Sequence, residues 1–145
     1  MQLGWAVWQH SNLFIEGELH AVYDPGDGRE WIDCTPNSFP DGSRCPEILF
    51  IPNDNESYDF RSTDIADNVR VPLVDDPRVL EALRLASDKN RLINRVPKTW
   101  RSGRLLYHYP PLLLAQITQL EWRITSLLSE ALRSPMSRAE VQERG

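Results

Sequence analysis

The 145-residue sequence has few cysteines and no long hydrophobic run. Its two cysteines, Cys34 and Cys45, are too few for a disulfide scaffold, so we expect reduced thiols in a cytoplasmic protein. No apolar run approaches the roughly 18–20 residues that a membrane span requires, and the first residues lack the basic and apolar regions of a signal peptide. The sequence therefore predicts no membrane partner.

Motifs for common cofactors are also missing. The 7 glycines form no phosphate-cradling loop, and neither C-x₂-C nor H-E-x-x-H spacing occurs. We therefore expect no cofactor and no metal. One alternative stays open, a metal held by Glu16, Glu18, His20 and Asp33, although same-face neighbours on a strand lie about 7 Å apart.

What the sequence does contain is typical of a globular protein. Hydrophobic residues make up 41% and charged residues 26%, and the length predicts a single domain over residues 1–145. Residues 1–75 hold 14 acidic against 4 basic side chains, and residues 76–145 hold 7 against 12. This asymmetry predicts either attraction between the two halves or an acidic surface for a basic partner.

The first half has the composition of strands and turns. We expect strands at residues 4–8, 48–51 and 69–74, and a hairpin over residues 13–35 whose turn lies at residues 25–28. Alternation in the first arm of this hairpin separates an apolar side from a side with Glu16, Glu18 and His20. Gly17 falls on the apolar side and predicts a bulge or a close contact.

The second half has the periodicity of helices. Asp76 followed by Pro77 is typical of a helix start, and Val79, Leu80 and Leu83 would form the inner face of a helix at residues 76–88. A heptad-like stripe predicts a helix at residues 111–132, which either docks on the sheet or forms a homodimer. The fold class is therefore α+β, a small antiparallel sheet (residues 4–75) packed against two or more C-terminal helices, with a flexible tail at residues 135–145.

One candidate catalytic pair lies in the predicted hairpin. With a four-residue loop at residues 25–28, Val22 faces Trp31 and His20 faces Asp33 across the two strands. Directly opposed residues have Cβ atoms about 4.5–5.5 Å apart, so imidazole and carboxylate can hydrogen-bond. The carboxylate would orient the imidazole and stabilise its protonated form, as in a nucleophile–His–Asp triad. A slip of one residue would place the two groups on opposite faces.

These residues resemble a family pattern. The order His-Ala-Val-Tyr, glycine-bearing turn, Asp-x-Thr-Pro is similar to the His–Asp half of papain-like and transglutaminase-like cysteine enzymes. A closer likeness, over roughly residues 4–85, is to small uncharacterised bacterial proteins that commonly carry a cysteine upstream. It is carried by Gly4-Trp5-x-x-Trp8, Phe14-Ile15-Glu16-x-Glu18-x-His20-Ala21-Val22 and Asp33-x-Thr35-Pro36.

The resemblance implies a cysteine nucleophile before the histidine, and no cysteine precedes His20 here. The nucleophile is then lost, replaced, or supplied by a partner chain. Cys34 adjoins Asp33, so its side chain would point to the opposite face and serve as a small buried hydrophobe. Cys45 lies beside Arg44, a cation that can lower the pKa of a thiol, and it is the candidate catalytic thiol of this chain.

A second candidate binding region lies at residues 95–109. Basic and aromatic side chains alternate there, which suits either single-stranded nucleic acid or a loop that packs its aromatic rings. The net charge of −5 favours the packed loop. The candidate binding residues of the chain are Glu16, Glu18, Arg95, Trp100, Arg101 and Arg104.

Two main functions follow from these patterns. The first is a degenerate papain- or transglutaminase-like scaffold that binds or inhibits another protein. This chain would then be, for example, a mobile-element inhibitor of a basic nucleic-acid-binding defence protein. The second is a cysteine-dependent hydrolase or acyltransferase that uses His20 and Asp33 with Cys45 or a thiol supplied in trans. Weak nucleic-acid binding through residues 95–109 is the third alternative.

Overall fold

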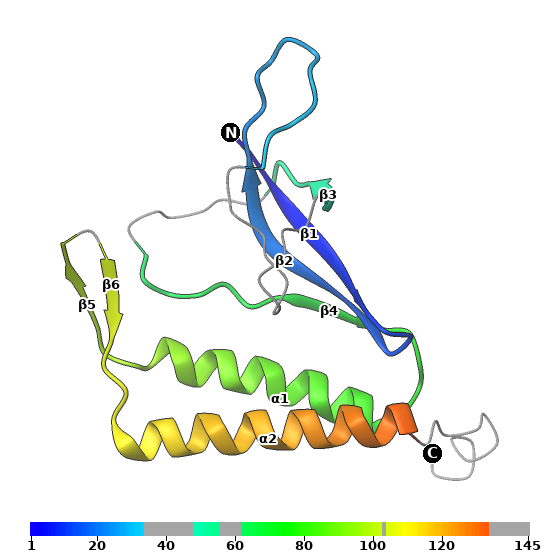
Figure 1. Cartoon of the computed structure of the whole chain (residues 1–145), viewed down its shortest axis with the longest axis vertical. Helices are drawn as coiled ribbons and strands as arrows, with labels where there is room; N and C mark the ends of the chain where they lie inside the picture. The colour runs from blue at the N-terminus through cyan, green and yellow to red at the C-terminus, as the bar shows by residue number, and fades with distance from the viewer. Residues whose placement is uncertain (34–47, 56–61, 103, 134–145) are drawn as a thin grey trace.

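The computed structural model describes residues 1–33, 48–55, 62–102 and 104–133 (Figure 1). A four-stranded antiparallel sheet, a two-stranded sheet and two helices make up these residues, which confirms the expected α+β class. Neither helix is long and apolar enough to cross a membrane. The predicted tail at residues 135–145 and both cysteines lie outside the described residues.

The larger sheet has the strand order β3-β1-β2-β4. Its central hairpin joins β1 to β2 through a tight turn in which Ser11 has a left-handed backbone (φ 52°). β2 therefore pairs chiefly with β1, and of the predicted hairpin over residues 13–35 the described residues keep one antiparallel bridge, between Tyr23 and Ile32. The strands are β1 (Gln2–His10), β2 (Phe14–Val22), β3 (Leu49–Pro52) and β4 (Val69–Pro72).

The two faces of this sheet differ in chemistry. Residues paired across strands share a face, so the register assigns each side chain. One face, which we name the apolar face, carries no charge. The opposite face carries Glu16, Glu18, His20 and Arg70. We use the name for the patch formed on this side by Trp5, Val7, Ile15, Gly17, Leu49, Ile51, Val69 and Val71; Leu3, Gln9, Leu19 and Ala21 lie on the same side of the sheet.

The helices α1 (Pro77–Asn94) and α2 (Pro111–Arg133) form an antiparallel pair (Figure 1). As predicted, Asp76 caps α1 and accepts a hydrogen bond from the Arg78 backbone N–H at 2.9 Å. The helix runs past the expected end at Asp88, because Leu92 continues the apolar face of Leu85 seven residues earlier. Leu80 is exposed, contrary to prediction, and Ala82 is buried in its place.

The heptad-like apolar stripe of α2 packs against α1 of the same chain. Leu127 packs with Ala82 and Leu85 of α1, and Leu120 and Ile124 lie against the same cluster. A homodimer would therefore have to use another face of α2. The other face does expose Leu112 and Trp122.

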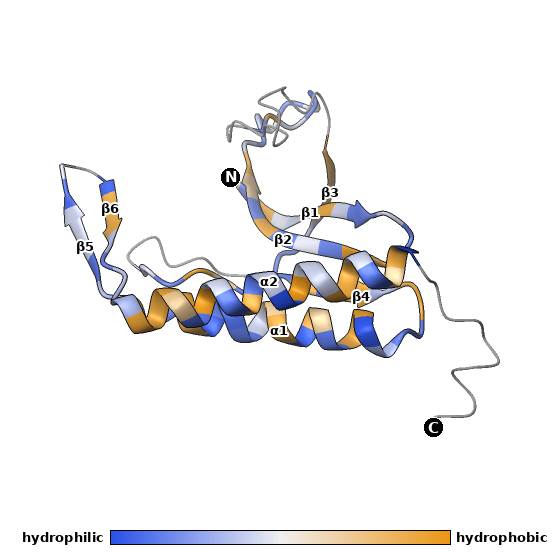
Figure 2. Cartoon of the chain, turned by 60° about the horizontal axis from the view of Figure 1, so that its bottom comes forward, coloured by the Kyte–Doolittle hydropathy of each residue, from blue (hydrophilic) through white to orange (hydrophobic). Residues whose placement is uncertain are grey.

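The apolar contact between the sheet and the helix pair is one small cluster. Leu13 and Phe14, at the start of β2, are buried against Val79 of α1 and Ala131 of α2. Since Phe14 lies on the charged face of the sheet, the helices cover that side only (Figure 2). The apolar face is left without a covering layer among the described residues.

A second hairpin, β5 (Lys98–Arg101) with β6 (Arg104–Tyr107), connects the two helices. The sequence interpretation of this segment as a loop is wrong. Lys98 and Trp100 alternate with polar neighbours, which is the pattern that could have predicted a strand. A strand of four residues, however, gives too few repeats for this alternation to be recognised.

Candidate functional site

His20 and Asp33 lie in direct contact. His20 is on β2, opposite Gly4 of β1, and its Nε2 is 2.9 Å from Oδ1 of Asp33. The imidazole is only 9% exposed, and the carboxylate is 21% exposed. The predicted pair therefore meets in the structure, at the end of the sheet that extends away from the helices.

The contact forms in a register that differs from the predicted one. Tyr23 was expected opposite Glu30, but it exchanges two backbone hydrogen bonds with Ile32, both 2.9 Å long. The difference is two residues, so Asp33 stays on the face of His20 as a diagonal neighbour. The loop between the bridged residues contains Gly26 and Gly28, whose positive φ angles favour glycine.

Two aromatic side chains, Phe50 and Trp31, belong to segments next to this pair. An added Cβ at Gly4 would lie 2.2 Å from the Ile51 carbonyl oxygen and 2.6 Å from the Phe50 ring. Phe50 thus reaches over β1 only because residue 4 is glycine. Its ring meets Trp31 edge-on, with centroids 5.6 Å apart. Trp31 and Asp33 belong to the same short segment, so this contact helps to hold the carboxylate beside His20.

The geometry suits an oriented general base. A carboxylate can only accept, so Nε2 of His20 carries the proton of this hydrogen bond. In the neutral ring, Nδ1 is then the nitrogen that can take a proton from a nucleophile. The candidate thiol Cys45, like Cys34, lies outside the described residues.

Glu16 has a structural partner instead of an open site. Its carboxylate accepts from Arg70 Nε at 2.8 Å and from Asn68 Nδ2 at 3.0 Å, and it contacts His10 Nε2 at 2.9 Å. These contacts tie β2 to β4 and engage the Glu16 oxygens. The described residues contain no group of three or more His, Cys, Asp or Glu side chains that could hold a metal ion.

Arg70 extends this network to the helices. It pairs with Asp67 at 3.0 Å, and Asn90 of α1 donates to the same carboxylate oxygen. Burial acts to raise the pKa of Asp67, but hydrogen bonds from Ser87, Arg70 and Asn90, with the charge of Arg70, hold that pKa below its usual value.

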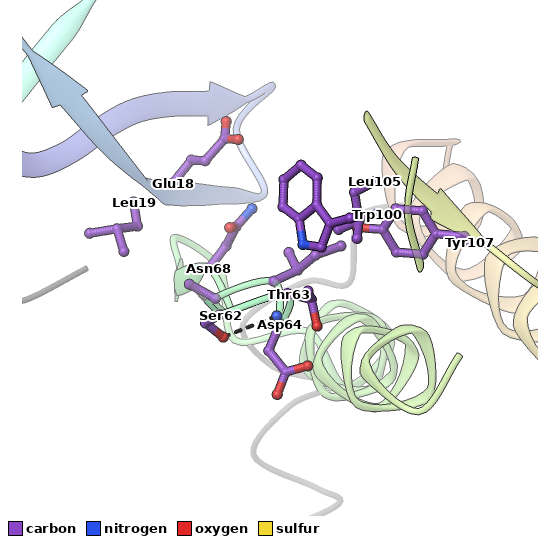
Figure 3. Close-up of a pocket in the computed structure, with 11 residues that line it drawn as sticks. Glu18, Leu19, Ser62, Thr63, Asp64, Asn68, Trp100, Leu105 and Tyr107 are labelled. Atoms are coloured by element: carbon purple, nitrogen blue, oxygen red, sulfur yellow. Dashed lines mark hydrogen bonds between the residues drawn. The ribbon is translucent and has the colours of Figure 1, made fainter. Parts of the chain in front are cut away.

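A pocket of about 340 Å³ lies between β2, the segment at residues 62–68 and the β5–β6 hairpin (Figure 3). It joins two segments that the sequence analysis treated separately, because Glu18 and Trp100 line it together. The 62–68 segment is fixed by Asn94, which exchanges hydrogen bonds of 2.8 and 2.9 Å with the Ile65 backbone. We name this site the hairpin pocket; Glu18, Asp64, Asn68, Trp100, Leu105 and Tyr107 are among its lining residues.

The predicted basic residues do not line this pocket. Arg95 follows the end of α1, and its backbone N–H satisfies the last carbonyls of the helix. Arg101 and Arg104 are opposite each other in the strand register at the tip of the β5–β6 hairpin, and both are exposed. Two of the lining residues, Glu18 and Asp64, are acidic and repel phosphate, which disfavours nucleic acid in the pocket.

Sequence reasoning missed Asp64 and the uncovered apolar face. Apolar side chains recur at every second residue at Trp5 and Val7, and again at Val69 and Val71. These two patterns would have indicated the face, once the pairing of β1 with β2 was known. Comparison with protein-family models, with curated proteins and with solved structures found no match for this chain.

Proposed function

We propose that this chain is a protein-binding module on a degenerate papain- or transglutaminase-like scaffold, and that a partner protein docks on its apolar face. The observation that carries the proposal is the exposure of apolar side chains on that face. Leu49 is 65% exposed, and three further members of the face are each about half exposed: Ile51, Val69 and Val71.

The exposed apolar area of this face approaches that of the largest patch on a typical monomer, about 300–600 Å², and such patches are often functional. Burial of one aliphatic side chain contributes about 1.5–3 kcal/mol, at about 25 cal/mol per Å², and the ratio of the two gives the apolar area of one side chain. Multiplied by the exposed fractions, this area gives roughly 130–260 Å² for these four residues alone. The half-buried Trp5, Val7 and Ile15 add to the same continuous patch. Patches beyond a few hundred Å² are uncommon on monomers and are typical of interaction sites.

The shape of the face supports an apolar anchor on the partner. Gly17 lies at its centre, where an added Cβ would be 3.5 Å from Cβ of Trp5. The strands pair regularly here and the added Cβ would make only an ordinary van der Waals contact, so Gly17 marks neither the bulge nor the close contact that the sequence predicted. Around it the face encloses an apolar hollow of about 190 Å³. An apolar cavity of about 150 Å³ holds a benzene ring, so one large apolar side chain fits.

The dimensions favour an amphipathic helix as the docking element. Four strands at about 4.8 Å spacing span about 14 Å, and a helix with its side chains is about 10–12 Å wide. The apolar face has no charged member, so the helix must present an apolar stripe, with its polar side chains turned to solvent. A second copy of this chain is the competing occupant that the experiment has to separate.

Site-specific photocrosslinking tests this proposal. A benzophenone amino acid at Leu49, introduced in the native cells, should form one discrete adduct with another protein. The same group at Leu112, which is 75% exposed on α2, serves as the control and should not form that adduct. Val69→Glu should abolish the adduct while the far-UV circular dichroism is unchanged. An adduct of twice the chain mass, or none at Leu49, contradicts the proposal.

Acyl transfer or hydrolysis is the second candidate function, favoured by the 2.9 Å contact between His20 and Asp33. In this reaction a thiol gives its proton to the His20 ring, and the thiolate attacks an acyl carbon to form a thioester. The leaving group takes the proton back, and water or an amine releases the acyl group. Asp33 orients the ring throughout and stabilises its charged form.

Thiol labelling tests this second function. Iodoacetamide should label the catalytic thiol rapidly at neutral pH, and His20→Ala should slow this labelling at least tenfold. His10→Ala is the matched control, since His10 is an exposed histidine that contacts Glu16. Cys45→Ser identifies the thiol within this chain. Equal labelling rates in the wild type and in His20→Ala would exclude the function.

A further inference from the structure

The hairpin pocket combines aromatic and acidic walls. Trp100 of β5 is 61% exposed, and its ring faces the pocket together with Tyr107 of β6 (Figure 3). The other lining residues include the acidic Glu18 and Asp64 and the amide-bearing Asn68. Aromatic faces and carboxylates both attract cations, so the lining favours a positively charged group.

A cation of the chain itself already uses these groups. The Lys98 ammonium lies 3.0 Å from Asp64 Oδ1 and 5.8 Å from the centre of the Tyr107 ring, and its side chain is only 5% exposed. Lys98 is thus satisfied at the inner wall. This contact shows that a carboxylate and an aromatic ring of this region together hold a buried ammonium group.

The outer wall has capacity for a second cation. Glu18 is exposed on β2, and its carboxylate makes no hydrogen bond or ion pair within the part of the chain that the structure describes. Trp100 likewise presents its ring to solvent. With about 340 Å³, the pocket is within the size range of small-ligand sites, about 300–1,000 Å³.

We propose that the hairpin pocket binds an arginine side chain presented by a partner polypeptide. The planar guanidinium stacks on the Trp100 ring, which an ammonium does less well. The Glu18 carboxylate and the Asn68 side-chain oxygen accept its N–H groups. The aliphatic stem lies against Leu105.

This inference is independent of docking on the apolar face. Glu18 is on the charged face of the sheet, whereas the proposed helix site is on the opposite face. Either site can therefore fail without the other. Glu18 and His20 are two residues apart on the same strand face, about 7 Å along β2, so a segment bound through its arginine would pass close to His20.

The test is a titration followed through the Trp100 indole N–H signal in ¹⁵N NMR, assigned by its loss in Trp100→Phe. The probe is the peptide acetyl-Gly-Arg-Gly-amide, and the matched peptide has citrulline, which is isosteric and neutral. The arginine peptide should shift the Trp100 signal saturably, and the citrulline peptide should not. The affinity should fall as ionic strength rises, because part of the attraction is electrostatic.

Matched variants locate the charge. Glu18→Gln should weaken binding about two- to fivefold, as expected for one partly exposed charged contact. Glu30→Gln, which removes an exposed carboxylate elsewhere, should leave the affinity unchanged. Equal binding of both peptides, or no effect of Glu18→Gln, overturns the proposal. A larger Trp100 shift with an octathymidine oligonucleotide than with the arginine peptide also overturns it, in favour of nucleic acid.

Discussion

Gly4 is the residue on which the surroundings of His20 depend most directly. It faces His20 across the hairpin, and its missing side chain leaves space for the Phe50 ring and for the Ile51 carbonyl of β3. Because the carbonyl belongs to a paired strand, it cannot rotate away as a side-chain end could. A side chain at position 4 must therefore displace β3.

We expect Gly4→Ala to lower the free energy of unfolding by about 1–3 kcal/mol, the usual cost of overpacking. Gly17→Ala is the control in the same sheet, because its Cβ would meet Trp5 at an ordinary 3.5 Å. Urea unfolding measures both variants. A Gly4→Ala protein as stable as Gly17→Ala would show that β3 does not approach β1 in this way.

Asp67 links acidity to stability. Its pKa is held below the usual value by Ser87, Arg70 and Asn90, so the folded state favours the charged carboxylate. This stabilisation is fully present above the unfolded pKa of about 3.9 and is lost as the pH falls through the lower folded pKa. Asp67→Asn should therefore be less stable than the wild type at pH 7.

The difference between Asp67→Asn and the wild type should shrink below about pH 4. Chemical unfolding at pH 3, 5 and 7 measures this, with Glu30→Gln as an exposed carboxylate control. A difference that stays constant over this range would mean that Asp67 acts by size and hydrogen bonding alone.

At the scale of elements, local patterns predicted what local interactions determine. The start of α1 was predicted because Asp76 and Pro77 act within one turn, and the cap is where it was expected. The sequence analysis did not predict that β2 pairs with β1, because two turn sequences, near Ser11 and near Gly26, could each close a hairpin with this strand. The sequence alone does not say which turn closes a ladder.

The His20–Asp33 contact was predicted through an incorrect register and still forms. Strand side chains repeat every two residues, so a two-residue difference preserved the face. The hairpin pocket could not be predicted, since it joins β2 to a hairpin about 80 residues further along the chain. The 62–68 segment brings these parts together, because Asn94 of α1 holds Ile65 and Lys98 of β5 pairs with Asp64.

The cap of α1 gives a prediction for this element. Asp76 is 4% exposed, caps the helix and pairs with the Arg78 guanidinium at 2.6 Å. Asp76→Ala should cost about 1–2 kcal/mol of unfolding free energy. Asp75→Ala, its exposed neighbour, should stay within about 0.5 kcal/mol of the wild type. Thermal and urea unfolding compare the two, and equal effects would assign the stabilisation to general charge at the helix start.

At the scale of the whole molecule, the two halves meet through few groups. The acidic first half and the basic second half do attract each other where Lys98 pairs with Asp64. Further acidic side chains are neutralised within the first half, as Glu16 is by Arg70. The charge asymmetry of the sequence is therefore used partly inside the fold, and Glu18 remains as acidic surface beside the hairpin pocket.

The apolar junction between sheet and helices is the small cluster around Phe14, so the sheet and the helix pair should open separately. Phe14→Ala should cost about 3 kcal/mol, at the lower end for a buried phenylalanine. In hydrogen exchange, amides of β1 and β2 should then lose more protection than those around Ala82 and Leu85. Leu127→Ala, which empties the helix interface instead, should give the reverse pattern. If both variants raise exchange equally throughout, the chain unfolds as one unit, and the sheet cannot adjust to a partner without the helices.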